Sequence, residues 1–315
     1  MRKALFLILL IFVLSCNSEK KSKPQIEPKI QVSIPEFNAD SSFEYLKKQV
    51  SFGPRVPNTK AHDDCKNFII SEISKYADAV NLQEFTHFYL GKNFNLTNII
   101  ASFNLNSGYR ILLCAHWDSR PYADEEKEAS KKIKPVPGAN DGASGVAILL
   151  EIARILKDNP PPIGVDVVFF DGEDLGASGD LENFCIGSKY FAKNKPKNYV
   201  PQFGILLDMV GDKDLEIYKE ENSMRYAPDV VNYVWSIARE LGFSEFKESV
   251  KHSVYDDHIP LNEAGIRTID IIDFDYPYWH TTEDTPDKCS PESLKKVGTV
   301  ILNVIYRYGE GIAVR

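Results

Sequence analysis

The sequence lacks several features that mark particular classes of protein. No run of five or more basic residues occurs among its 315 residues, and its formal net charge is −8, so binding to nucleic acid through counterion release is not expected. No C-x-x-C pair is present, and the spacing of the cysteines therefore does not indicate a metal site. No internal repeat occurs. A strand followed by G-x-S-x-G is also missing, which argues against a serine nucleophile.

The N-terminus carries an apolar run that is too short to span a bilayer. The run extends from Ala4 to Leu14 after the basic pair Arg2 and Lys3, whereas a spanning helix needs roughly 20 apolar residues. A basic start with a short apolar core is typical of a secretory signal. The segment ends in VLSC, which resembles the lipobox of bacterial lipoprotein signals, with Cys16 as the lipidated residue. We therefore predict a signal peptide at 1–15 and an exported lipoprotein, anchored in a membrane on the periplasmic or cell-surface side.

The next segment, residues 16–36, is polar and interrupted by proline, and it has little apolar surface to bury. Such a composition predicts a flexible tether. From about Phe37 the pattern becomes globular and continues without a second linker, which predicts one domain at 37–315. The remaining cysteines could be oxidised in an exported chain, but their spacing does not fix a pairing. The sequence gives no sign of an oligomer, and a monomer is the default expectation.

Short apolar runs alternate with helical patterns along this domain. The predicted strands are NIIASF (98–103), RILLCAH (110–116), GVDVVFF (164–170), FGILLDMV (203–210) and RTIDII (267–272). Helices are predicted at 40–50, where Ser41 and Glu44 are spaced as a capping box, at 145–158, at 227–242 and after Ser290. Near-continuous apolar strands between helices predict a single α/β domain: a twisted, mostly parallel or mixed central sheet with helices on both faces.

Polar side chains follow three of these strands. His116 and Asp118 end the run at 110–116, Glu173 and Asp174 follow the run at 164–170, and Asp208 lies within the run at 203–210. In open α/β sheets, sites form beyond the carboxyl ends of the strands. We therefore expect these side chains to meet at one edge of the sheet.

A catalytic zinc site needs three nitrogen or oxygen ligands and one open position. Asp141, in the glycine-rich turn GANDGASG, together with Asp174 and His280 can supply them. Glu173 is adjacent to a predicted ligand and is placed to act as a general base without binding the metal. Asp118, two residues from His116, is a candidate for the hydrogen-bonded carboxylate that commonly supports a metal-binding histidine.

The order of these motifs resembles that of the zinc aminopeptidase family, whose fold the animal-type glutaminyl cyclases share. The motifs are HWD at 116–118, NDG at 140–142, ED at 173–174, LLD at 206–208 and the late HTTED at 280–284. Two details favour the cyclases: DDHIP at 256–260, where aminopeptidases usually carry Ser before the Asp-His pair, and WHT at 279–281. Within that group, the chain looks closest to the bacterial cyclase-like lipoproteins. Four segments carry this likeness: FGPRVPNT, AHWDSRP, FGILLDMVGD and YWHTTEDT.

The resemblance implies a zinc-dependent glutaminyl cyclase, an aminoacyltransferase that converts the N-terminal glutamine of peptides and proteins to pyroglutamate and releases ammonia. Asp141, Asp174 and His280 would bind one zinc ion, and Glu173 would be the acid and base. Trp279 would form a wall of the substrate pocket. Asp208 and Asp256 would be hydrogen-bonded to each other and to Glu173. Asp174 departs from the family, which more often has the longer Glu at this position.

Two alternatives remain. In a two-zinc aminopeptidase, His116 and Asp208 would also bind metal, Asp141 would bridge both ions, and Glu173 would activate a water molecule to hydrolyse the first peptide bond. Asp256 argues against this activity, because its carboxylate could share a proton with Asp208 and withdraw it from a second metal. A binding module without chemistry is the other alternative, but such a protein would be expected to have lost Glu173 or a ligand.

Overall fold

The computed structural model describes residues 33–313. The predicted signal peptide, Cys16 and most of the predicted tether lie outside the described residues. Within them, no helix is both long and apolar enough to cross a membrane.

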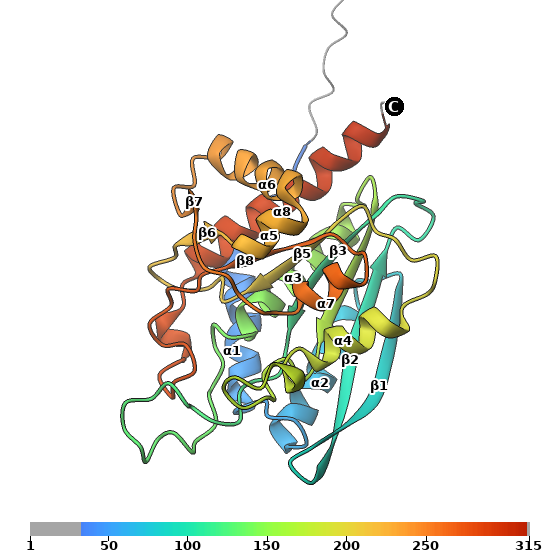
Figure 1. Cartoon of the computed structure of the whole chain (residues 1–315). Coiled ribbons are helices and arrows are strands. Elements are labelled where there is room, and N and C mark those ends of the chain that lie inside the picture. Colours follow the sequence, from blue (N-terminus) through green and yellow to red (C-terminus); the bar gives the residue numbers. More distant parts are fainter. Residues whose placement is uncertain (1–32, 314–315) are drawn as a thin grey trace, which may run out of the picture. The chain divides into compact units, whose positions relative to one another are not determined.

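The core of the described chain is a six-stranded mixed sheet with the strand order β1-β2-β4-β3-β5-β8 (Figure 1). The bounds are β1 Ala79–Tyr89, β2 Lys92–Phe103, β3 Arg110–His116, β4 Gly164–Phe170, β5 Gly204–Asp208 and β8 Thr268–Ile272. The four strands β4, β3, β5 and β8 are parallel to one another, whereas β2 is antiparallel to both β4 and β1. Strands β6 (Ile217–Lys219) and β7 (Phe246–Val250) form a separate parallel pair.

Helices cover both faces of this sheet (Figure 1). Their bounds are α1 Ala39–Ser51, α2 Lys60–Ile73, α3 Ala143–Asp158, α4 Ile186–Asn194, α5 Glu221–Tyr226, α6 Pro228–Glu240, α7 His258–Glu263 and α8 Pro291–Ala313. Successive side chains of β3 point to opposite faces: Leu113 joins the main core with α1, α3 and α8, whereas Cys114 packs with Phe191 of α4 and Leu261 of α7. The predicted α/β fold, with a mixed sheet between helices, is confirmed.

The helix ends agree only partly with the sequence prediction. Helix α1 begins at Ala39, and the side chain of Asn38 caps it by accepting a hydrogen bond from the N–H of Ser41. The predicted capping box of Ser41 and Glu44 is therefore wrong: both residues lie inside the helix, because Asn38 provides a competent cap earlier in the chain. At α8 the prediction is confirmed, since Oγ of Ser290 accepts the N–H groups of Glu292 and Ser293.

Close packing between α3 and β5 brings two parts of the site together. A Cβ atom at Gly145, in the first turn of α3, would lie 2.1 Å from the carbonyl oxygen of Leu207 in β5. Only glycine allows this approach. The turn before α3, which carries Asp141, is thereby held against the end of β5, where Asp208 lies.

Candidate active site

The predicted site residues meet at the carboxyl ends of the parallel strands. His116 ends β3, Asp208 ends β5, and Glu173 and Asp174 follow β4. Gly172 has φ of 72°, a left-handed conformation that favours glycine, and this residue turns the chain directly after β4. A cavity of about 230 Å³ opens at this edge and is lined by every residue predicted for the site except His116 and its predicted support Asp118. His116 itself is buried, with 1% of its surface exposed.

Asp141, Asp174 and His280 form one candidate metal group. Each offers a ligand atom within 4.8 Å of the other two. Nε2 of His280 lies 3.3 Å from Oδ1 of Asp174 and 3.7 Å from Oδ2 of Asp141. The other oxygen of Asp174, Oδ2, is buried and accepts no hydrogen bond from the described residues. Burial favours protonation of Asp174, but the charges of His280 and Arg120 outweigh it and hold its pKa below the ordinary value. An ionised, buried carboxylate with an unsatisfied oxygen beside an imidazole fits a zinc ion.

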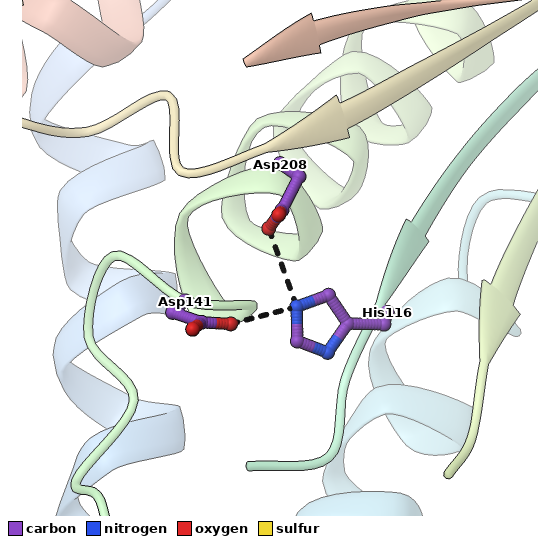
Figure 2. A group of neighbouring side chains, drawn as sticks. All are labelled: His116, Asp141 and Asp208. Carbon is purple, nitrogen blue, oxygen red and sulfur yellow. Dashed lines mark hydrogen bonds and ion pairs between the residues drawn. The ribbon is translucent and has the colours of Figure 1, made fainter. Parts of the chain in front are cut away.

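His116, Asp141 and Asp208 form a second candidate group, which shares Asp141 with the first (Figure 2). Nε2 of His116 lies 3.0 Å from Oδ1 of Asp141 and 3.2 Å from Oδ1 of Asp208. The other ring nitrogen, Nδ1, lies 3.4 Å from Asp118, the carboxylate expected to support it. Burial lowers the pKa of His116, but the three surrounding carboxylates raise it further, to well above its ordinary value. This group also has the donor types that zinc prefers.

Glu173 is fixed by its backbone and by a thiol. Asp118 accepts the N–H groups of both Glu173 and Asp174, so one buried carboxylate orients the predicted base and the adjacent predicted ligand. The thiol of Cys185 donates to Oε1 of Glu173 at 3.4 Å. Burial and the negative charge of Asp174 raise the pKa of Glu173 well above its ordinary value. A carboxyl group whose pKa is raised in this way can act as a general acid as well as a general base.

Asp256 lies beside Glu173, and the two residues offer carboxylate oxygens within 4.8 Å of each other. Oδ2 of Asp256 is buried without a partner among the described residues, and burial together with the charge of Asp208 raises its pKa. Oδ1 of Asp208 lies 3.2 Å from Nε2 of His116 and accepts the N–H of Met209. The hydrogen bond between Asp208 and Asp256 that the resemblance implies stays a prediction.

Trp279 is half-buried and forms part of the cavity wall. Its ring stacks on His280, with the centroids 3.9 Å apart, and contacts Phe274 at 5.1 Å. The aromatic surface therefore lies directly beside the first metal group.

Three residues in this site were not found from the sequence. Arg120 donates to Asp174 and to Asp124, and Asp124 in turn lies 3.4 Å from Nδ1 of His280. Cys185 contacts Glu173. Arg120 and Asp124 lie in the segment between β3 and α3, where no periodicity predicts the direction of a side chain. The only sequence signal for Arg120 was the segment AHWDSRP, which carries the family resemblance and contains Arg120. The resemblance assigned no role to this arginine.

The profile of peptidase family M28 matches residues 98–305, which include every residue of both metal groups. The chain belongs to peptidase family M28. Among curated relatives, it is 29% identical over 225 residues to aminopeptidase YwaD of Bacillus subtilis, in a match that covers 67% of this chain and 44% of that protein. It is 24% identical over 258 residues to the glutaminyl-peptide cyclotransferase of Drosophila melanogaster, with coverage of 73% and 70%. The match thus spans less than half of YwaD.

Solved structures resemble the chain over nearly their whole length. The glutaminyl cyclase of Tannerella forsythia is 44% identical, with a TM-score of 0.83 and coverage of 86% of this chain and 99% of that chain. A Zn-dependent exopeptidase from Parabacteroides distasonis is 42% identical, with a TM-score of 0.84 and coverage of 87% and 99%. The M28 fold and the donor set of the site both support zinc as the metal.

Proposed function

We propose that this protein is a glutaminyl-peptide cyclotransferase that binds one zinc ion through Asp141, Asp174 and His280. Its substrates are peptides and proteins with N-terminal glutamine, and its products are the N-terminal pyroglutamate and ammonia. Support comes from the likeness to the Tannerella forsythia cyclase at 44% identity and to the Drosophila melanogaster cyclotransferase at 24% identity.

One observation carries the choice of a single zinc ion. All three members of the Asp141 group line the cavity, together with Glu173 and Asp256, whereas His116 of the second group does not. The second group reaches the cavity only through Asp208 and the shared Asp141, so a substrate there faces one complete set of three ligands beside the two carboxyl groups. One metal position and one acid–base residue suffice for cyclisation, whereas a two-zinc hydrolysis would also need a metal at His116.

The chain's own residues account for the proton transfers. Glu173 accepts the proton of the substrate α-amine as the amine nitrogen bonds to the side-chain carboxamide carbon. The same carboxyl group then delivers that proton to the amide nitrogen, and the carbon–nitrogen bond breaks as ammonia departs. No water is consumed. A zinc ion in the Asp141 group would supply Lewis-acid polarisation of the carboxamide carbonyl. The wall formed by Trp279 and Phe274 excludes water and holds the glutamine side chain against the ligands.

Asp256 lies beside the acid–base group, with carboxylate oxygens of the two residues within 4.8 Å of each other. Burial and the charge of Asp208 raise the pKa of Asp256 and favour its protonated form. A protonated Asp256 would donate a hydrogen bond to the Glu173 carboxylate and so stabilise it until the substrate amine gives up its proton. Both carboxyl groups need the low exposure that they have, 4% for Asp256 and 9% for Glu173.

One observation favours the alternative, a two-zinc aminopeptidase. Nε2 of His116 points at both Asp141 and Asp208, the arrangement that a second metal ion would need (Figure 2). The relative YwaD carries the name aminopeptidase. In that activity Glu173 would activate a water molecule, and the first peptide bond would be cleaved.

Mass spectrometry of a peptide with N-terminal glutamine, incubated with residues 37–315, separates the two activities. We expect the loss of one ammonia and one zinc ion per chain in the same sample. His116→Ala is the matched variant: it should keep the zinc ion and the cyclisation, because His116 does not line the cavity. Three outcomes would each establish the aminopeptidase instead. The peptide could lose its whole first residue, or the protein could bind two zinc ions per chain. The third outcome is that His116→Ala is inactive and has also lost metal.

We further propose that the domain is held at a membrane through lipidated Cys16 and acts as a monomer on exported peptides, outside the cytoplasm. The VLSC segment and the polar tether at 16–36 support this location. Radiolabelled palmitate incorporation that is lost in Cys16→Ala, and membrane fractionation of the two forms, would test it.

A further inference from the structure

A buried arginine connects two of the zinc ligands. Arg120 lies between β3 and α3 and has 2% of its surface exposed. Its Nη1 donates to Oδ1 of Asp174 at 3.0 Å. Its Nε and Nη2 donate to the two oxygens of Asp124 at 2.8 and 2.5 Å, which is a bidentate pair. All three nitrogen atoms of the guanidinium therefore donate hydrogen bonds.

The second partner, Asp124, continues the connection. Its Oδ1 lies 3.4 Å from Nδ1 of His280, the ring nitrogen that faces away from the metal group. The opposite nitrogen, Nε2, lies 3.3 Å from Asp174. Metal-binding histidines commonly donate their other N–H to a carboxylate, which fixes the tautomer and the ring orientation. Asp174, Arg120, Asp124 and His280 thus form a closed ring of contacts that includes two of the three proposed ligands.

Arg120 also holds the backbone from which Asp174 projects. Its Nη1 donates to the carbonyl oxygens of Asp174, at 3.4 Å, and Gly176, at 3.1 Å. The guanidinium lies over the ring of Phe184, 5.1 Å from its centroid, so it is confined on that side as well. Because Asp174 has a short side chain, the position of its backbone decides whether its carboxylate reaches the metal. One oxygen is occupied by Arg120, and the other, Oδ2, is left free for the ion.

We propose that Arg120 and Asp124 are positioning residues that set zinc affinity by holding Asp174 and His280 in ligand geometry before the metal binds. The inference rests on the proposed function only in taking Asp141, Asp174 and His280 as the zinc ligands. It assigns neither residue a contact with the substrate. A purely structural role, fixing the segment between β3 and α3, would affect folding but would not change zinc affinity in the folded protein.

The test is zinc affinity of the folded domain, measured by competition with a chromophoric chelator. Arg120→Met keeps the aliphatic stem and removes the guanidinium, and we expect it to weaken zinc binding about 10- to 100-fold. Asp124→Asn keeps the shape and removes the charge, and a loss of about tenfold is expected. The double variant should lose little more than Arg120→Met alone, because both residues act through one unit. Near-UV circular dichroism confirms that each variant is folded.

Arg110→Met is the matched control. Arg110 forms a similar bidentate pair with Asp166, at 2.8 and 2.7 Å, at the first residue of β3 and therefore at the far end of the strand from the site. We expect this variant to bind zinc as the unmodified protein does. If Arg120→Met does not fold, Asp124→Asn carries the test.

Three outcomes would overturn the inference. The first is zinc affinity of folded Arg120→Met or Asp124→Asn within twofold of the unmodified protein. The second is an equal loss in Arg110→Met. If the unmodified protein itself binds no zinc, both the inference and the proposed function fail, whereas the first two outcomes leave the proposed function intact.

Discussion

The thiol of Cys185 lies 3.4 Å from Oε1 of Glu173, and the N–H of Cys185 donates to the backbone oxygen of the same residue at 2.8 Å. Cys185 immediately precedes α4 and is fully buried. The start of this helix therefore contacts both the side chain and the backbone of Glu173. Burial raises the pKa of the thiol well above its ordinary value, and Glu173 raises it further. The cysteine is therefore a neutral hydrogen-bond donor to the proposed base rather than a nucleophile.

Replacing Cys185 should affect the rate more than substrate binding. Cys185→Ala removes the donor and frees the Glu173 carboxyl group, and we expect kcat to fall about 3- to 10-fold with KM nearly unchanged, as for the loss of one hydrogen bond of about 1 kcal/mol. Cys185→Ser restores a donor and should recover most of the rate. Steady-state kinetics of both variants provide the check. Equal rates in Cys185→Ala and the unmodified protein would show that the contact does not position Glu173.

Glu173→Gln should abolish turnover while leaving zinc bound. The amide cannot accept the amine proton, so kcat should fall by about 10²- to 10⁴-fold. The side chain belongs neither to the Asp141, Asp174 and His280 group nor to the His116, Asp141 and Asp208 group, so zinc per chain, measured by atomic emission, should not change. Retained activity would remove the role assigned to Glu173, and a loss of zinc would instead make Glu173 a ligand.

Asp256→Ala should lower cyclisation about tenfold or more without unfolding the chain, since it removes a protonatable group beside the base. Asp257→Ala serves as a comparison, because Asp257 neighbours Asp256 but does not line the cavity. Cyclisation assays and thermal unfolding of both variants are needed. An Asp256→Ala enzyme with an unaltered rate would remove the main argument from the sequence against the aminopeptidase.

A prediction on stability concerns Glu220, which caps α5. Burial raises the pKa of this carboxyl group, but the contact with His258 and the N–H groups of Asn222 and Ser223 outweigh burial and lower it to about 2. Because the folded pKa lies below the unfolded value of about 4.3, ionised Glu220 stabilises the fold above that pH, and the contribution is lost as the pH falls toward 2. Glu220→Gln should cost on the order of 2–3 kcal/mol at pH 7.

Urea unfolding of Glu220→Gln and of the unmodified domain at pH 7, 5 and 3 would test whether the stabilisation by Glu220 is lost as the pH falls. The difference in the free energy of unfolding should be constant between pH 7 and 5 and smaller at pH 3. A difference that grows as the pH falls would contradict it.

Much of the sheet was predictable from the sequence, because its inner strands are buried on both faces and read as apolar runs. All residues of β4 are buried, for example. Strand β1 was missed for the opposite reason. It lies at the edge of the sheet, and its side chains are intermediate or exposed, as in LQEFTHF, so the apolar signal is weak.

The site residues that lie at the ends of strands were predictable from the sequence. His116, Asp174 and Asp208 each follow an apolar run, and parallel strands bring their carboxyl ends together. The contacts of Arg120 and Cys185 were not predictable, since they depend on how two irregular segments fold over that edge.

The proposed zinc ligands stand at positions 141, 174 and 280, and about half of the domain separates the first from the last. No short segment of the chain can therefore capture the ion by itself. On synthesis or export, His280 emerges only after all the strands of the central sheet, so the metal is acquired late and from the compartment in which folding is completed. Bound zinc would accordingly report that the complete sheet has assembled, and the metal content of a preparation would measure its fraction of native molecules.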